Sequence, residues 1–216
     1  MVKEHWTKRT KGPVIFTEGD NDCHVIVSIC QKYGINESFG FYSCGSDDQC
    51  IKALRAKLYS SDIPDKLAIV IDADNPSLDA KWNSIKSILS DYMDDVPDIP
   101  DENGCVLELN KNLSKPIRLG VWFMPNNRID GMLEDFCIEL APEKSIQLAT
   151  EYIDKCIQNE LWNCARTHRS KSIIHAFLAV QDEPGNPLGL ALTKNNLNIS
   201  HESVLVFRDW INRVFN

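Results

Sequence analysis

The apolar run Leu67-Ala-Ile-Val-Ile71 is the feature that most constrains how this chain can fold. An unbroken apolar segment of this length predicts a strand whose two faces are both covered. Strands of this kind occur in parallel sheets, because the connections between parallel strands place helices on both faces. The run ends at Asp72-Ala-Asp74, so we expect carboxylates at this end of the sheet.

The rest of the chain repeats the alternation of strand and helix signals. Further strands are expected at 13–17, 38–43, 105–109 and 119–124. Helical spacing of apolar residues is found at 24–33, 47–59, 78–92, 130–140, 142–164, 170–180 and 201–215. This order predicts an α/β fold with a Rossmann-like, mostly parallel sheet, helices on both faces and a helical C-terminal part.

The domain organisation follows from the polarity of the first residues. Residues 1–12 are polar and include Lys8, Arg9 and Lys11, so we expect a polar N-terminal arm. Residues 13–216 are expected to form a single domain, with a core over 13–140 and a helical extension over 141–216.

Composition limits the classes of protein to which this chain can belong. No segment approaches the roughly 18 apolar residues of a membrane helix, and the N-terminus lacks an apolar signal core, so we expect a cytoplasmic protein without a membrane partner. The eight cysteines show no Cys-x-x-Cys spacing. Reduced thiols are therefore expected, with a structural zinc site as the alternative. The net charge of −8 disfavours a broad basic surface for nucleic acid, but clustered carboxylates that hold metal ions also add negative charge.

Three carboxylates follow two of the predicted strands. Glu18 comes directly after the strand at 13–17, and Asp72 and Asp74 follow the strand at 67–71. Ligands of open α/β sheets bind at the carboxyl ends of the strands, and hard cations such as Mg²⁺ prefer oxygen ligands. Asp72 and Asp74 would point the same way if the strand continued through both. The sequence therefore predicts a divalent-metal site, although acids after strands also serve as helix caps.

These residues carry a resemblance to a known family. Glu18-Gly-Asp-Asn-Asp22, followed by Ile71-Asp-Ala-Asp74, resembles the Toprim domain shared by topoisomerases, primases and overcoming-lysogenization-defect nucleases. Later segments resemble a small prokaryotic Toprim-like family, DUF3226; they are Gly131-Met-Leu-Glu-Asp-Phe136, Lys171-Ser-Ile-Ile-His-Ala-Phe-Leu-Ala179, Pro187-Leu-Gly189 and Trp210. The resemblance covers residues 13 to 215.

The resemblance implies roles for individual residues. Glu18 would be the general acid and base or a metal ligand, and Asp72 and Asp74 would hold Mg²⁺ or Mn²⁺. Asp22 would supply a second acidic residue four positions after the first. A later acid would come from Glu134 or Asp135, and the sequence leaves open which of the two faces inward. Lys171 would contact the scissile phosphate, with a solvated lysine at the start of a helix as the alternative.

Two functions from different classes fit these features. The first is a Mg²⁺-dependent nuclease or phosphotransfer enzyme that acts on DNA or RNA, in phage defence with a partner ATPase. The second is a non-catalytic regulatory module that binds a metal, a nucleotide or a protein. A homo-oligomer is compatible with either function.

Overall fold

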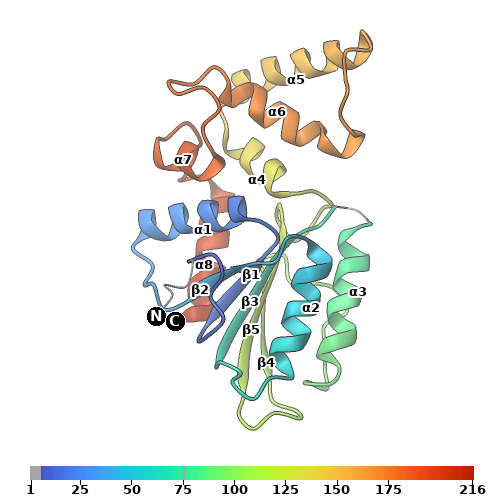
Figure 1. The fold of residues 1–216 in the computed structure, drawn as a ribbon, viewed down its shortest axis with the longest axis vertical. Coiled ribbons are helices and arrows are strands. Elements are labelled where there is room, and N and C mark those ends of the chain that lie inside the picture. The colour runs from blue at the N-terminus through green and yellow to red at the C-terminus, as the bar shows by residue number, and fades with distance from the viewer. Residues whose placement is uncertain (1–5, 75) are drawn as a thin grey trace.

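The structure is a computed structural model that describes residues 6–74 and 76–216 (Figure 1). The strands are β1 (Val14–Thr17), β2 (Gly40–Ser43), β3 (Lys66–Asp72), β4 (Cys105–Leu109) and β5 (Ile117–Met124). The α-helices are α1 (Asp20–Tyr33), α2 (Asp47–Leu58), α3 (Leu78–Leu89), α4 (Leu133–Leu140), α5 (Glu143–Gln158), α6 (Arg169–Leu178), α7 (Leu188–Thr193) and α8 (Glu202–Phe215). A short 3₁₀ turn at Arg166–His168 precedes α6.

The strands form one sheet, as the alternating sequence pattern predicts, and their order in it is β2-β1-β3-β5-β4. β2, β1, β3 and β5 are parallel, and β4 is antiparallel to β5. The chain leaves β1 toward β2 and then crosses back to β3 on the other side of β1. The strand order therefore changes direction between β1 and β3, where open α/β sheets bind ligands.

Each face of the sheet is covered by helices, which confirms the mostly parallel α/β fold (Figure 1). Alternating side chains of β1 enter different cores, because successive residues of a strand point to opposite faces. Val14 and Phe16 pack in the core that contains residues of α2 and α3. Ile15 packs in the other core, which contains residues of α1 and α8. β3 is apolar from Leu67 to Ile71 because its two faces also pack in these two cores.

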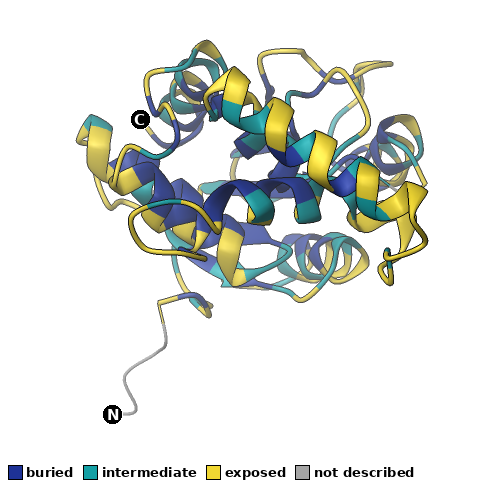
Figure 2. Cartoon of the chain, turned by 90° about the horizontal axis from the view of Figure 1, so that it is seen from above, coloured by how far each residue is buried: buried dark blue, intermediate teal, exposed yellow. Residues whose placement is uncertain are grey.

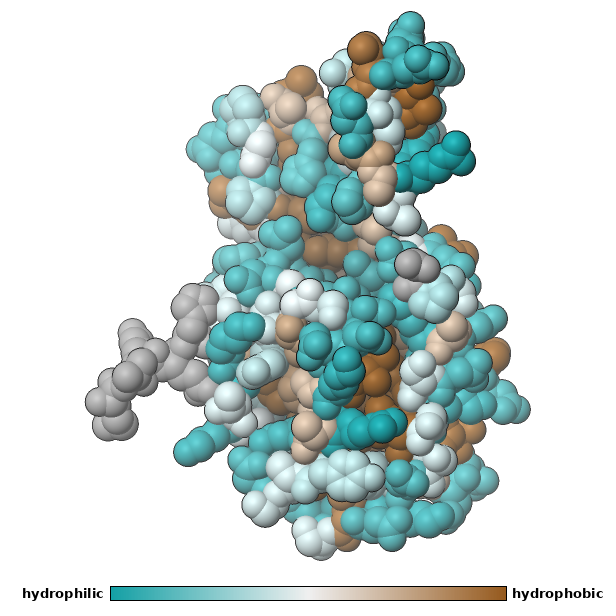
Figure 3. Space-filling model, turned by 45° about the vertical axis from the view of Figure 1, so that its right-hand side comes forward, coloured by the Kyte–Doolittle hydropathy of each residue, from teal (hydrophilic) through white to brown (hydrophobic). Residues whose placement is uncertain are grey.

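The helices after β5 divide into two groups. α8 packs against β3, β4 and β5, whereas α5 and α6 pack on each other and project from the sheet (Figure 1). The space-filling view shows a waist between the sheet and this projecting part (Figure 3). Most of α5 is exposed when the molecule is seen from above (Figure 2).

The described part of the N-terminal arm is paired with the sheet. The backbone N–H of Arg9 donates to the Phe41 carbonyl at 2.7 Å, and that of Ser43 donates to the Thr7 carbonyl at 2.8 Å. The arm therefore extends the sheet beyond the edge strand β2. All eight cysteines are free. Within residues 6–74 and 76–216, no helix is long and apolar enough to cross a membrane.

Candidate functional site

A pocket of about 580 Å³ lies at the carboxyl ends of β1 and β3, where the strand order reverses. Its lining includes five acidic residues and two lysines, which are Glu18, Asp20, Asp22, Asp72, Glu134, Lys8 and Lys171. The predicted residues Asp74 and Asp135 do not line it. The pocket therefore combines a cluster of acids with two cations.

Glu18 and Asp72 are held by hydrogen bonds to the backbone. The backbone N–H of Asp72 donates to Glu18 Oε1 at 2.8 Å, which joins the ends of β1 and β3. Asp72 Oδ1 accepts from the backbone N–H of Leu133 at 2.9 Å. Leu133 is the first residue of α4, so the positive end of that helix dipole faces Asp72. One oxygen of each carboxylate is thus positioned by the backbone.

Asp22 lies in the first turn of α1, beside the other two carboxylates. Its Oδ2 accepts from the backbone N–H of Gly19 at 3.0 Å, which satisfies a donor at the start of the helix. The Asp22 side chain is buried, although it faces the acidic pocket. Asp22 therefore combines a capping role with a place in the carboxylate cluster.

The choice between Glu134 and Asp135 follows from where α4 begins. Asp135 is the third residue of this helix, and its Oδ2 accepts from the backbone N–H of Met132 at 2.9 Å. It therefore caps the helix. Glu134 is buried, lines the pocket and forms an ion pair with Lys171, whose Nζ lies 3.3 Å from Glu134 Oε1. Of the two acids, only Glu134 faces the site.

Asp74 lies apart from the pocket because β3 ends at Asp72, so the strand does not continue through both acids. Asp74 Oδ1 is instead 3.4 Å from Nζ of Lys81, a buried lysine of α3. The same ammonium lies 3.1 Å from Asp47 Oδ2. Burial lowers the pKa of Lys81, but its hydrogen bond with Asp47 and the charges of Asp47, Glu18 and Asp74 outweigh burial and raise it. Lys81 therefore remains a cation beside the acidic cluster.

Crowding and burial perturb the acids of the pocket. Burial, followed by the negative charges of Asp22 and Glu18, raises the pKa of Asp72 from 3.8 to about 9. Burial and the charges of Glu18 and Glu134 raise the pKa of Asp22 from 3.8 to about 7, against the hydrogen bond from Gly19. Burial also raises the pKa of Glu18, although the Asp72 N–H and Lys81 oppose the shift. Without a bound cation, these carboxyls are protonated more readily than exposed acids.

The donor set suits a hard cation, because all the candidate ligands are carboxylate oxygens. As the side chains stand, no three His, Cys, Asp or Glu residues among those described are arranged to hold a metal ion. Mg²⁺ in proteins commonly keeps several waters and binds through one or two carboxylates. Glu18 and Asp72 are the residues best placed to hold it in this way.

Comparison with known proteins shows the family. A family model described as "Protein of unknown function (DUF3226)" matches residues 13–216. The chain belongs to the DUF3226 family. No curated protein and no solved structure matched this DUF3226 chain. The match includes every described residue of the acidic pocket except Lys8, which lies in the arm.

Three residues in or beside the pocket of this DUF3226 protein, Lys8, Asp20 and Lys81, are not among the site residues predicted from the sequence. Lys8 reaches the pocket because the arm pairs with β2, a contact between residues 35 positions apart, and no local pattern indicates it. Lys81 had a usable signal, because it lies between Leu78 and Ile85 on the buried side of a predicted helix. A lysine at such a position requires a buried partner.

Proposed function

We propose that this protein is a Mg²⁺-dependent nuclease of the Toprim type, which cleaves phosphodiester bonds of nucleic acid. The observation that supports the proposal is the meeting of five acidic residues with two lysines at the switch point of a mostly parallel sheet. In metal-dependent phosphodiester cleavage, a cation stabilises the attacking and leaving oxygens, and further positive charge stabilises the phosphate. The acids of this pocket could hold such a cation, and its two lysines could supply the further positive charge.

In this proposal, Glu18 and Asp72 hold the metal, which supplies Lewis-acid stabilisation of the phosphate oxygens. Glu18, with its raised pKa, is the group best suited to take or return a proton at a reacting oxygen. Lys171 is half exposed and Lys8 also lines the pocket, so both can neutralise charge on the phosphate. Asp22 and Glu134 add negative charge that increases the affinity for a cation.

The test is a cleavage assay on the full chain. Wild-type protein is incubated with single-stranded and double-stranded DNA and RNA, with Mg²⁺ or Mn²⁺ and with EDTA. We expect metal-dependent cleavage that Glu18→Gln reduces on the order of a thousandfold, since several kcal/mol of transition-state stabilisation are lost. Glu143→Gln, an exposed acid on α5, is the matched control and should cleave like wild type. Equal cleavage by the Glu18 and Glu143 variants would refute the assignment.

A second function is favoured by the net charge of −8, which disfavours broad binding of nucleic acid. In this alternative the chain is a non-catalytic regulatory module that binds a metal, a nucleotide or a protein partner. Calorimetric titration with Mn²⁺ separates the two functions. Binding of Mn²⁺ without cleavage of any substrate would support the module.

The different roles of Glu134 and Asp135 give a further prediction. Asp135→Ala should lower the free energy of unfolding by about 1 kcal/mol through loss of the cap, with unchanged affinity for Mn²⁺. Glu134→Ala should weaken Mn²⁺ binding about tenfold, because it removes a buried negative charge beside the ligands. Urea unfolding and calorimetry on the two variants measure both quantities. The opposite pattern would assign Asp135 to the site.

A further inference from the structure

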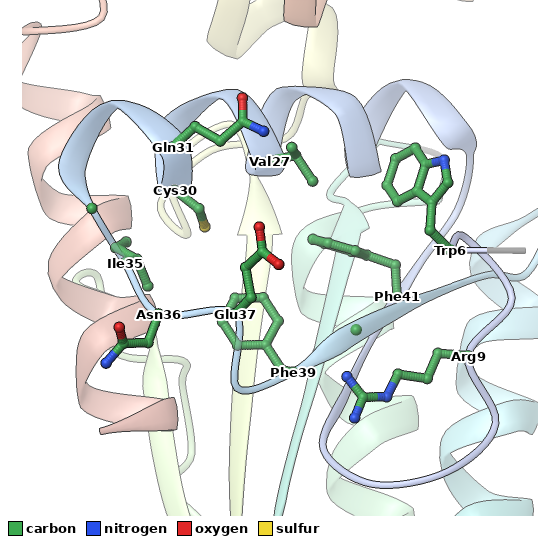
Figure 4. Close-up of a pocket in the computed structure, with 12 residues that line it drawn as sticks. Trp6, Arg9, Val27, Cys30, Gln31, Ile35, Asn36, Glu37, Phe39 and Phe41 are labelled. Atoms are coloured by element: carbon green, nitrogen blue, oxygen red, sulfur yellow. The ribbon is translucent and has the colours of Figure 1, made fainter.

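A second pocket, of about 460 Å³, opens between the C-terminal half of α1 and the edge strand β2 (Figure 4). It lies by Gly40, at the start of β2, whereas Ser43 at the end of the strand lines the carboxylate pocket. A volume of this size suits a small organic group. The sequence patterns gave no sign of this pocket, because its walls come from the arm, α1 and the segment before β2.

Aromatic rings form much of the wall. Phe39 and Phe41 are buried, with ring centroids 5.9 Å apart and planes at 75°. The Trp6 ring lies 5.9 Å from Phe41 and 5.0 Å from the His24 ring, and at 42% exposure part of it is accessible to a ligand. A flat ligand could stack on such rings, which present both faces and edges.

Polar groups stand among these rings. The Glu37 carboxylate lies between α1 and β2, with Phe41 on one side and Cys30 on the other (Figure 4). In the part of the chain that the structure describes, no ion pair or hydrogen bond engages this carboxylate. The guanidinium of Arg9 lies at the rim beside β2 (Figure 4). A ligand that fits therefore has a flat face, a hydrogen-bond donor at its edge and an attached anionic group.

We propose that this pocket binds an unpaired nucleobase of a single-stranded nucleic acid, and prefers bases that carry an exocyclic amino group. In this proposal, stacking on Trp6 provides affinity for any base. Glu37 accepts a hydrogen bond from the amino group of the base, and Arg9 faces the backbone phosphate. The arm links the two pockets, because Trp6 and Arg9 line this one while Lys8 lines the carboxylate pocket. Gly40 and Ser43 are three strand steps apart, or about 10 Å, so one short strand of nucleic acid could reach both. The substrate assignment rests on the proposed nuclease function.

Binding is measured with EDTA present, so that the result does not depend on metal or cleavage. Labelled single strands of about ten nucleotides, of dA, dC or dT, and a blunt duplex are titrated with full-length protein and read by fluorescence anisotropy. We expect single strands to bind more tightly than duplex, and dA and dC more tightly than dT. Trp6→Ala should weaken binding of all three about tenfold, and Trp6→Phe should restore most of it.

Glu37→Ala tests whether Glu37 recognises the amino group of the base. It should remove the preference for dA and dC over dT, while the matched exposed acid variant Glu143→Ala keeps that preference. Circular dichroism confirms that each variant is folded. Unchanged affinity in Trp6→Ala, or equal affinity of wild type for dA and dT, would overturn the proposal. Loss of a dimer in Trp6→Ala, seen by light scattering, would also overturn it and assign the pocket to a second copy of this chain.

The two proposals fail in different ways. Cleavage by a protein whose binding ignores Trp6 and Glu37 would refute the base pocket alone. Binding that depends on Trp6 and Glu37, in a protein that cleaves nothing, would refute the nuclease alone.

Discussion

Asp72→Asn is expected to stabilise the metal-free protein at pH 8 and to abolish metal-dependent cleavage. The pKa of Asp72 is raised from 3.8 to about 9 by burial and by neighbouring carboxylates. The folded state therefore keeps a proton that the unfolded chain releases near pH 4, so wild-type stability falls as the pH rises from about 4 toward about 9. One pKa unit corresponds to about 1.4 kcal/mol, so the gain for asparagine at pH 8 amounts to several kcal/mol.

The amide preserves the local geometry, since its oxygen can still accept from the Leu133 N–H. Urea unfolding from pH 4.5 to 8.5 with EDTA measures the effect. The difference between the variant and wild type should be small at the acidic end and grow with pH. Asp79→Asn, an exposed acid on α3, is the control and should follow the wild-type profile. Parallel profiles for wild type and Asp72→Asn would show that Asp72 is not perturbed.

Addition of Mn²⁺ should reverse the order of stability. A bound cation favours the ionised carboxylate and stabilises the folded wild type in proportion to its occupancy. Asp72→Asn lacks this ligand charge, so its midpoint should not move with Mn²⁺, and its cleavage should fall on the order of a thousandfold. Functional sites often destabilise the folded protein when they are empty, and binding of the ligand restores its stability.

The parts of this site that the sequence predicts are those set by local pattern. Glu18 and Asp72 end apolar runs, and the alternation of strands and helices places those ends side by side. The orientation of each acid depends on where an element ends, which local pattern defines poorly. β3 ends one residue before Ala73, so Asp74 turns toward Lys81, and α4 begins at Leu133, so Asp135 becomes its cap. Their orientation could be settled only by the structure.

Long-range contacts account for the other differences. Pairing of the arm with β2 depends on hydrogen bonds between distant residues, so a polar N-terminal segment gives no sign of it. α7 was not predicted, because its six residues lie beyond a Pro-Gly-Asn-Pro turn and carry too little periodic signal. It packs closely on α1, where a Cβ on Gly189 would lie 2.8 Å from the His24 backbone. Packing of this kind becomes visible only when the fold is assembled.

Trp210→Ala is expected to lower the free energy of unfolding by about 3 to 5 kcal/mol, as for other fully buried aromatic side chains. Trp210 is completely buried, and its Nε1 donates to the Cys105 carbonyl at 2.9 Å. It packs on Trp122 and Phe207, with ring centroids 5.4 Å away in both cases. Gly104, directly before β4, leaves space for the Trp210 ring, because a Cβ at this position would clash with it.

The effect reaches the whole sheet, because α8 closes one of its two faces and contacts three strands. We therefore expect one unfolding transition, shifted to lower urea, in which the sheet and the C-terminal helices unfold together. Trp210→Phe should recover part of the loss, and Trp6→Ala, which truncates a half-exposed ring, should cost less than about 1 kcal/mol. Two separate transitions, or equal midpoints for the two alanine variants, would mean that α8 is an appendage that the sheet does not need. A single transition would instead show that the stability of the acidic pocket depends on α8, although no residue of α8 lines the pocket. The reason is that β1 and β3, at whose ends Glu18 and Asp72 lie, share a core with Trp210.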